Sequence, residues 1–343
     1  MIDLVVRHFA LPLRHPFTIS RGTVDVQDTV IVQLHQDGLF GYGEATTNPY
    51  YGATVESLTR RIAAFAPRLH AASADDLDGL LDTAAALLGA DTFAHCAVDL
   101  AIHDLWGKRR GGPLHRLWGL DPAAGPLSNY TIGIDTPERM AAKLAEVPDW
   151  PVYKIKLGTD RDLEIVRELR RHTAKPFRVD ANCGWTPRQA IELSGPLAEL
   201  GVEFIEQPLA ADDPGMAEVY RRSALPVFAD ESCGVEADVD RCAGRFHGIN
   251  IKLVKCGGLA AARRMIARAR ELGLAVMCGC MTESSVGISA LAQLVPLLDH
   301  VDMDGAALLA ADIAHGVVVE AGRRRYPDRA GTGVELLGGP LAA

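Results

Sequence analysis

The sequence lacks the features that mark several common classes of protein. Its first residues contain no basic segment followed by an apolar one, so we expect no signal peptide. No apolar run approaches the length of a transmembrane helix. Basic residues form no extended patch, and a net charge of −9 with a pI near 5.7 disfavours nucleic acid or an anionic membrane as partner.

Disulfide cross-links are also not expected. The seven cysteines in 343 residues follow no disulfide-framework spacing, and a chain of this length can bury a large core without cross-links. Cys278 and Cys280 could form half of a zinc site, but no second Cys or His pair lies near them, so we interpret them as barrel lining. We therefore expect reduced thiols and a cytoplasmic protein.

The N-terminal part of the chain predicts an α+β domain over residues 1–122. Residues 4–11, 29–35 and 41–45 alternate as strands of a small antiparallel sheet, with a hairpin turn at Gln36-Asp37-Gly38. A polar loop is expected between the first two strands, over residues 15–26. Helical patterns follow at residues 54–69, 75–88 and 93–108, and the last one ends before Gly111-Gly112-Pro113.

After residue 127 the pattern changes to alternating strands and helices. Eight short apolar segments recur at intervals of 22 to 26 residues, centred on Tyr130, Lys154, Asp180, Glu206, Asp230, Lys252, Cys278 and Asp302. Amphipathic patterns such as residues 162–172, 187–200 and 258–272 fill the gaps. The repeat predicts an α/β fold with a TIM barrel over residues 123–312. A doubly wound sheet is less favoured, because no Gly-x-Gly-x-x-Gly turn follows a strand.

No full helix is evident after the eighth segment, so the barrel is expected to be of the (β/α)7β type. We expect residues 313–343 to pack back on the N-terminal domain.

Three carboxylates mark the ends of consecutive predicted strands: Asp180, Glu206 and Asp230. The C-terminal ends of parallel barrel strands meet at the active site. Three anions there would repel one another unless a cation neutralised them, and Mg²⁺ suits this set of oxygen ligands best. Any one of these acids alone could instead cap the helix that follows it.

Lysines lie on both sides of these acids in the strand order. Lys154 and Lys156 share one face of a strand, although the pair alone also fits an edge strand kept soluble by charge. Lys252 ends the sixth strand, roughly opposite the second. A metal-bound carboxylate between them would present its α-carbon to a lysine on either face, with the metal stabilising the enediolate. Crowded cations would lower a lysine pKa and make it a usable base.

This arrangement predicts inversion at the α-carbon by a 1,1-proton transfer. Lys255 is out of phase with Lys252 and is expected to be exposed or to reach the site only through another residue.

The chain resembles the enolase superfamily, muconate-lactonizing subgroup. The resemblance rests on the Lys-x-Lys pair, the three acids, Asp230-Glu231-Ser232 and the segment from Asn250 to Gly258, and it also covers the Pro16–Gly22 loop and Met277–Met281. The segment Val301-Asp302-Met-Asp304-Gly305 is similar to the Asp-x-Asp element of the dipeptide epimerases. The resemblance implies an N-terminal domain that caps the barrel mouth.

Roles for individual residues are implied by this resemblance. Lys156 and Lys252 would be the acid/base pair, with Lys154 supporting Lys156 beside the substrate carboxylate. Asp180, Glu206 and Asp230 would bind one Mg²⁺ per subunit. Asp302 and Asp304 would pair with the ammonium group of a dipeptide, although a solvated strand end is an equal alternative, and Thr131 would also contact substrate.

Substrate choice is expected to depend on Arg21, in the loop that closes over the barrel. Arg21 could pair with a glutamate side chain, which would make L-Ala-D-Glu or L-Ala-L-Glu from murein (cell-wall) peptides the substrate. An exposed loop arginine is the alternative interpretation, and Arg14 competes for the role. Glu283 either caps the following helix or favours a cationic substrate side chain.

Other functions remain open on these residues. The chain could epimerise hydrophobic or cationic dipeptides, or act as a muconate cycloisomerase or o-succinylbenzoate synthase, whose substrates lack the ammonium group that Asp302 and Asp304 would bind. A Schiff-base lyase built on a barrel lysine is a candidate from another class. A non-catalytic binding barrel would not need opposed bases. The resemblance leaves a homo-oligomer open.

Overall fold

The alternating N-terminal segments form a three-stranded antiparallel sheet. In the computed structural model, which describes residues 1–70 and 72–342, β1 (Asp3–Ile19), β2 (Gly22–Gln36) and β3 (Leu39–Thr46) pair in sequence order. The predicted hairpin turn at Asp37 and Gly38 is confirmed, because Gln36 pairs with Leu39 and both turn residues have positive φ. These conformations suit Gly and Asp.

The polar loop predicted over residues 15–26 is wrong. β1 and β2 continue as a two-stranded ribbon to a turn at Ser20 and Arg21, with Phe17 opposite Val24 and Ile19 opposite Gly22. The strand period is present in Phe17 and Ile19, but the charged and polar residues around them obscure it.

Helix α3 (Thr92–Arg109) packs against the sheet of the N-terminal domain. A Cβ atom on Gly43 would lie 1.9 Å from Ala97 O, and one on Gly41 would lie 2.3 Å from Ala101 O. Only glycine allows the helix backbone to approach this closely. The other helices of this domain are η1 (Pro49–Tyr51), α1 (Val55–Ala63), η2 (Ala66–Leu69), α2 (Leu77–Leu88) and α4 (Leu114–Leu117).

The predicted helix over residues 54–69 is in fact two, α1 and η2. Pro67 is in the first turn of η2, where its missing N–H costs no hydrogen bond.

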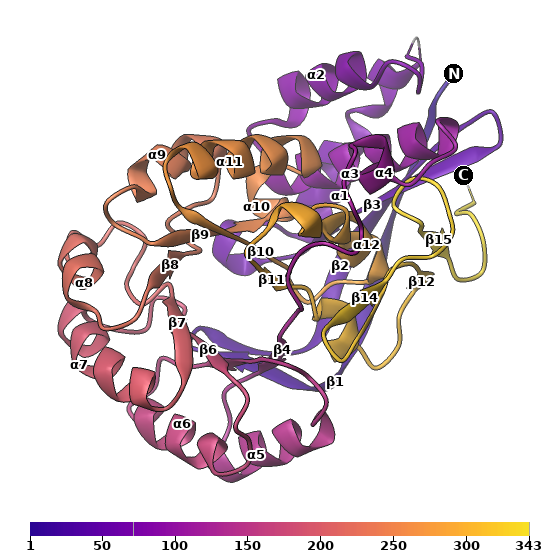
Figure 1. Ribbon diagram of the computed structural model, residues 1–343. Coiled ribbons are helices and arrows are strands. Elements are labelled where there is room, and N and C mark those ends of the chain that lie inside the picture. Colours follow the sequence, from indigo (N-terminus) through magenta and orange to yellow (C-terminus); the bar gives the residue numbers. More distant parts are fainter. Residues whose placement is uncertain (71, 343) are drawn as a thin grey trace.

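Eight parallel strands form the predicted TIM barrel (Figure 1). The strands are β4 (Tyr130–Ile132), β5 (Tyr153–Lys156), β6 (Phe177–Asp180), β7 (Val202–Glu206), β8 (Val227–Ala229), β9 (Gly248–Lys252), β10 (Ala275–Gly279) and β11 (His300–Asp302). Each pairs with the next in sequence, and a parallel bridge between Ser128 and Val301 brings the first and last strands together. The barrel fold class is therefore confirmed.

Helices surround the barrel on its outside (Figure 1). They are α5 (Pro137–Glu146), α6 (Asp162–Arg170), α7 (Pro187–Glu199), α8 (Met216–Arg222), η3 (Glu236–Asp238), α9 (Val239–Cys242), α10 (Leu253–Cys256), α11 (Leu259–Glu271), α12 (Ser285–Ala292) and η4 (Val295–Leu297). Among the described residues after β11 the only helix is the short η5 (Gly305–Leu308), in agreement with the expected (β/α)7β pattern. None of the helices in residues 1–70 and 72–342 is both long enough and apolar enough to cross a membrane.

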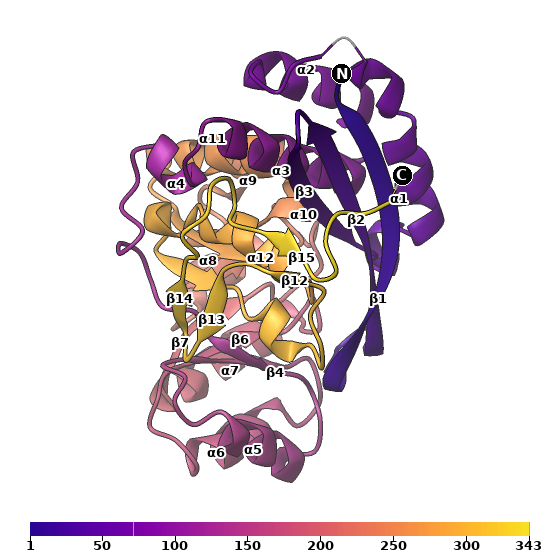
Figure 2. The same ribbon diagram turned by 90° about the vertical axis from the view of Figure 1, so that its right-hand side faces the viewer.

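The C-terminal segment returns to the N-terminal domain (Figure 2). It contains the short strands β12 (Ala314–His315), β13 (Val318–Glu320), β14 (Arg323–Arg325) and β15 (Glu335–Leu336). Leu341 N donates to Gln33 Oε1 at 2.6 Å, and Lys108 Nζ donates to Val334 O at 3.0 Å.

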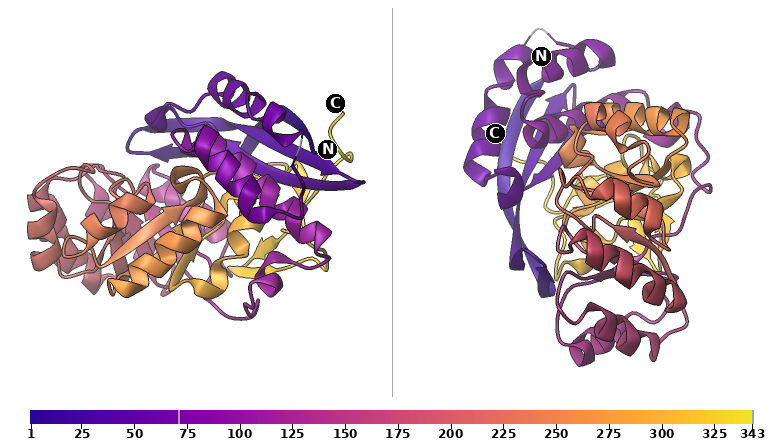
Figure 3. Two further views of the ribbon diagram at one scale, coloured as in Figure 1. Left: turned by 90° about the horizontal axis from the view of Figure 1, so that it is seen from above. Right: turned by 90° about the vertical axis from the view of Figure 1, so that its left-hand side faces the viewer.

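Two buried carboxylates of the N-terminal domain cap helices of the barrel. Asp99 on α3 accepts from Leu259 N at 2.6 Å, at the start of α11. Glu44 on β3 accepts from the N–H groups of Ser284 at 3.0 Å and Gly287 at 2.9 Å, at the start of α12. Carboxylates at a helix N-terminus are stabilising, so these contacts fix the N-terminal domain against the barrel. Figure 3 shows the sheet and α3 lying against the barrel.

Candidate active site

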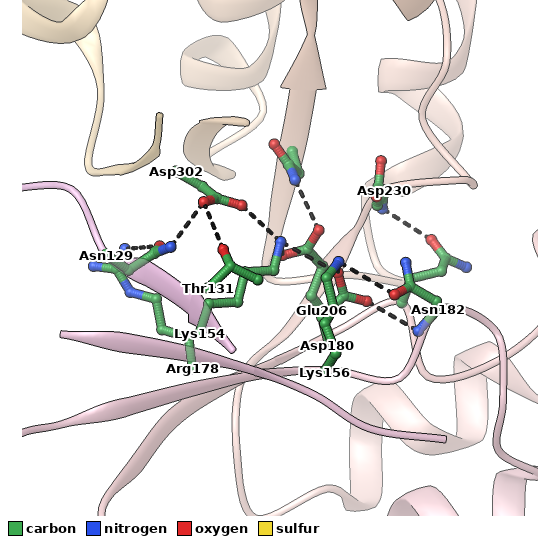
Figure 4. Close-up of polar contacts among 12 residues, drawn as sticks. Asn129, Thr131, Lys154, Lys156, Arg178, Asp180, Asn182, Glu206, Asp230 and Asp302 are labelled. Carbon is green, nitrogen blue, oxygen red and sulfur yellow. Dashed lines mark hydrogen bonds and ion pairs between the residues drawn. The ribbon is translucent and has the colours of Figure 1, made fainter. Parts of the chain in front are cut away.

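The C-terminal ends of the barrel strands bring most of the predicted residues into one cavity. The cavity has a volume of about 530 Å³, and its barrel side includes Lys154, Lys156, Asp230, Lys252, Asp302 and Asp304. Its other side is supplied by the N-terminal domain, through the tip of the β1–β2 ribbon and residues 47–51. Figure 4 shows the polar contacts at the strand ends.

The three predicted metal ligands lie together. One oxygen from each of Asp180, Glu206 and Asp230 lies within 4.8 Å of the others, and all three side chains are buried. Glu206 Oε2 is buried without a hydrogen-bond partner among the described residues, although Lys154 Nζ lies 2.8 Å from it as an ion-pair partner. Hard carboxylate oxygens in this arrangement fit a divalent cation such as Mg²⁺.

The pKa values of these carboxylates differ because their charged neighbours differ. Burial would raise the pKa of Asp180, but Lys156 and Lys154 lower it to about 2. Burial and the charge of Asp180 raise the pKa of Glu206 to about 7. Like charges brought together in a low dielectric produce this separation.

Lys154 lies at the centre of the acidic residues. Its Nζ lies 2.8 Å from Glu206 Oε2, 2.8 Å from Asp302 Oδ2 and 3.2 Å from Asp180 Oδ2. Burial would lower the pKa of Lys154, but these carboxylates raise it well above its usual value. The buried ion pairs exclude the alternative that Lys154 belongs to an exposed edge strand.

Lys156 and Lys252 come from opposite sides of the barrel, on β5 and β9. Lys156 Nζ lies 2.6 Å from Asp180 Oδ2 and donates to Asn182 Oδ1 at 3.2 Å. Lys252 Nζ lies 2.7 Å from Asp230 Oδ2. Each lysine therefore approaches the three predicted metal ligands from its own side.

The cations supplied by the protein's own side chains do not lower the pKa of Lys252 below its usual value. Burial and Lys154 lower the pKa of Lys252, but Asp230, Glu206 and Glu231 together raise it above its usual value. Carboxylates outnumber ammonium groups around it, which the spacing of the lysines alone does not show.

Lys255 is buried rather than exposed, with only 3% of its surface accessible. Its Nζ lies 2.6 Å from Asp230 Oδ1 and donates to Cys233 O at 3.2 Å. The prediction of exposure fails because α10 begins at Leu253, so strand alternation no longer sets the direction of Lys255. The other predicted alternative, contact through another residue, agrees with the structure.

Asp302 and Asp304 form a second acidic pair in the same cavity. Asp302 Oδ1 accepts from Asn129 Nδ2 at 2.7 Å, and Asp304 Oδ2 accepts from Thr131 N at 2.6 Å. Burial would raise the pKa of Asp302, but Lys154 lowers it, whereas burial and Asp302 raise the pKa of Asp304 well above its usual value. Both are buried, which excludes a solvated strand end.

Arg21, and not Arg14, lines this cavity among the two candidate arginines. Arg21 Nη1 lies 2.7 Å from Glu231 Oε1 and donates to Asn182 O at 3.0 Å, and the guanidinium lies over the Tyr50 ring. Arg14 Nε donates to Leu309 O at 2.9 Å. The pairing of Arg21 with Glu231 was not predicted, because the resemblance implies only that the Arg21 loop closes over the barrel and gives Arg21 no partner in the protein.

Glu283 does not cap the helix that follows it. Ser284 is the N-cap of α12, where its hydroxyl accepts from Val286 N. Glu283 is buried, and burial together with Glu44 raises its pKa well above the usual value.

Several polar residues of the site were missed by sequence reasoning: Asn129, Arg178, Asn182 and Asn250. Asn250 Nδ2 donates to Glu206 Oε1 at 2.8 Å. Arg178 and Asn250 each lie two residues before a predicted site residue on the same strand, and this period was the available signal.

The chain is similar to known proteins over nearly its whole length. Residues 1–119 match the model of the mandelate racemase / muconate lactonizing enzyme N-terminal domain, and residues 138–338 match the enolase C-terminal domain-like model. The L-Ala-D/L-amino acid epimerase of Flavobacterium johnsoniae is 50% identical over 98% of this chain and 100% of its own length.

Two further proteins extend the comparison. The L-Ala-D/L-Glu epimerase of Bacteroides thetaiotaomicron is 41% identical over 95% of this chain and 86% of its own. The structure of a dipeptide epimerase from Cytophaga hutchinsonii, complexed with Mg and the dipeptide D-Ala-L-Val, has a TM-score of 0.92 at 26% identity. The match covers 98% of this chain and 96% of that one.

Proposed function

Because the chain belongs to the mandelate racemase / muconate lactonizing enzyme family of the enolase superfamily and is an isomerase of its dipeptide epimerase group, we propose that it inverts the C-terminal residue of dipeptides beginning with L-alanine. The observation that carries this proposal is the pair of opposed lysines. Lys156 and Lys252 approach the three buried carboxylates from β5 and β9. A substrate α-carbon between them can lose its proton to one lysine and regain it from the other.

The cofactor of the chain is Mg²⁺, and Asp180, Glu206 and Asp230 are the residues that would bind it. When bound, it supplies positive charge beside the substrate carboxylate and offsets the negative charge that raises the lysine pKa values. Lys154 adds a fixed positive charge within 3.2 Å of Asp180, on the same strand face as Lys156.

Asp302 and Asp304 support a dipeptide with a free amino group as substrate. Both line the cavity, and Thr131 N fixes the orientation of Asp304. A buried pair of carboxylates attracts an ammonium group, whereas the substrates of cycloisomerases or o-succinylbenzoate synthase offer no such cation. This difference favours epimerisation over those reactions.

Arg21 supports glutamate as an accepted C-terminal residue. Nη1 of Arg21 is engaged by Glu231 and Asn182, but among the described residues none accepts from its Nε or Nη2. A substrate carboxylate could therefore pair with the remaining N–H groups. We propose L-Ala-D-Glu and L-Ala-L-Glu as substrates, within a wider range of L-Ala dipeptides.

The cysteines and the proposed substrates together indicate the compartment in which the enzyme acts. Seven free cysteines are compatible with a reducing compartment, so we propose that the enzyme acts in the cytoplasm on dipeptides from murein breakdown.

The proposal is tested by following loss of the substrate α-proton signal in heavy water across a library of L-Ala-X dipeptides. Exchange with inversion is expected for X = Glu, dependent on added Mg²⁺ and abolished by a chelator. Exchange that survives the chelator, together with borohydride trapping of an adduct, would support a Schiff-base lyase instead.

A further inference from the structure

Arg178 crosses the barrel interior below the predicted site. It lies on β6 two residues before Asp180, so its side chain points inward on the same face but one layer lower. Only 4% of its surface is accessible. Its guanidinium donates to Glu203 Oε2 at 3.0 Å, to Asn129 Oδ1 at 3.1 Å and to Val301 O at 3.2 Å. A fourth contact, at 3.2 Å, joins Nη2 to His300 Nδ1.

These contacts determine which way the Asn129 amide faces. A guanidinium can only donate, so Oδ1 of Asn129 must face Arg178 and Nδ2 must face away from it. Nδ2 then donates to Asp302 Oδ1 at 2.7 Å (Figure 4). With the amide reversed, NH₂ would face the guanidinium and oxygen would face the carboxylate, and both contacts would be repulsive.

Arg178 also reaches Asp302 through the backbone. Val301 O, which accepts from Arg178 Nη1, belongs to the residue immediately before Asp302. The other oxygen of Asp302, Oδ2, lies 2.8 Å from Lys154 Nζ. The side chain and the backbone of Asp302 are thus both fixed, and two of the contacts that fix them depend on Arg178.

We infer that Arg178 is a positioning residue for the substrate ammonium site, acting through Asn129 and Val301 to orient Asp302. The inference rests on the proposed function, in which Asp302 binds the dipeptide amino group. Arg178 itself makes none of its hydrogen bonds to the predicted metal ligands, since its partners are Glu203, Asn129, Val301 and His300. Loss of the Arg178 contacts should therefore affect recognition of the amino group and leave Mg²⁺ binding unchanged.

The test compares L-Ala-L-Glu with N-propionyl-L-Glu, which differs only by lacking the ammonium group. The variants are Arg178→Lys, Asn129→Leu and the double variant. The matched control is Arg170→Lys, because Arg170 also donates to backbone carbonyls, those of Leu200, Thr173 and Lys175, but does so outside the barrel. Folding of each variant is verified by circular dichroism, and Mg²⁺ affinity is measured by calorimetry without substrate.

The preference for L-Ala-L-Glu over the propionyl compound, as a ratio of kcat/KM values, is expected to fall about 10- to 100-fold in Arg178→Lys and in Asn129→Leu. The double variant should lose no more of this preference than the more damaging single variant, since both changes break the same set of contacts between Arg178 and Asp302. Mg²⁺ affinity and the Arg170→Lys enzyme should be unchanged.

Equal losses for both compounds, additive effects in the double variant, or weakened Mg²⁺ binding would overturn the inference and make Arg178 a purely structural residue. If Arg178→Lys does not fold, Asn129→Leu still allows the two compounds to be compared, because this variant removes only the amide. The proposed function fails in a different way, when the unmodified enzyme does not prefer L-Ala-L-Glu over the propionyl compound.

Discussion

In the proposed function, the choice of substrate side chain depends on Arg21. It is held by Glu231 at 2.7 Å and Asn182 at 3.0 Å, and it lies over Tyr50. A glutamate side chain in the cavity would add a second carboxylate to the same guanidinium. Arg21 would then contribute binding energy for an acidic residue and little for a neutral one.

Replacing Arg21 with Met should lower kcat/KM for L-Ala-L-Glu about 10- to 100-fold, because one charge-assisted hydrogen-bonded contact is lost. The value for L-Ala-L-Leu should change far less. Steady-state kinetics with both dipeptides provide the measurement, and Arg14→Met is the control because Arg14 contacts Leu309 O instead. An equal loss for both dipeptides would show that Arg21 holds the β1–β2 ribbon in place and does not recognise the substrate side chain.

The residues at strand ends could be predicted from the sequence, whereas their partners could not. Strand period and βα spacing place Lys156, Asp180 and Lys252 on one rim, because side chains alternate regularly along a strand. The contact of Arg21 with Glu231 joins two loops more than 200 residues apart, and no local pattern encodes it. The burial of Lys255 could not be predicted for a related reason, since α10 begins at Leu253, inside a segment whose alternation predicts a strand.

At the scale of elements, the contact of α3 with β3 depends on two glycines. The Cβ of an alanine at position 43 would lie 1.9 Å from Ala97 O, which is backbone and cannot move without shifting the helix.

Gly43→Ala should therefore destabilise the protein by about 1–3 kcal/mol or more through overpacking. Urea unfolding followed by circular dichroism measures this difference. Gly195→Ala in α7 is the control, because no heavy atom lies within 4 Å of the added Cβ, and it should be neutral or stabilising by up to about 1 kcal/mol. A Gly43→Ala protein as stable as the unmodified one would show that the helix can move away freely.

Helix α3 also contains a buried ion pair beside its contact with α11. His103 Nδ1 lies 3.2 Å from Asp99 Oδ1, and Asp99 caps α11. Burial and Arg263 on α11 lower the pKa of His103, but Asp99 raises it above its usual value of 6.5 overall. A raised pKa in the folded state means that this contribution to stability is complete below pH 6.5 and is lost as the pH rises through the folded-state pKa.

The free energy of unfolding of the unmodified protein, minus that of His103→Gln, should thus decrease as the pH rises above about 6.5. The decrease amounts to about 1.4 kcal/mol for each unit by which the pKa is raised. Urea titrations of both proteins across this range measure it. A difference that stays constant, or grows with pH, would show that His103 is neutral in the folded protein.

At the scale of the whole molecule, the cavity exists only where the two domains meet. The barrel supplies the lysines and carboxylates, and the N-terminal domain supplies Arg21, Tyr50 and the tip of the β1–β2 ribbon. The repeat in the sequence predicted the barrel, because each βα unit carries its own hydrophobic period. The resemblance implies that the N-terminal domain caps the barrel, but not the contacts that join them, since these involve single buried acids such as Glu44 and Asp99 whose partners lie 160 to 243 residues away.

The central claim is that Lys156 and Lys252 act on opposite faces of one substrate α-carbon. It is tested most directly by α-proton exchange of each L-Ala-Glu epimer in heavy water with Lys156→Ala and Lys252→Ala, and with Lys143→Ala as the control. Each site variant should lose epimerisation by about 10²-fold or more and keep exchange of a single epimer, a different one in each variant. Exchange of the same epimer in both variants, or epimerisation at the unmodified rate in either, would contradict the claim.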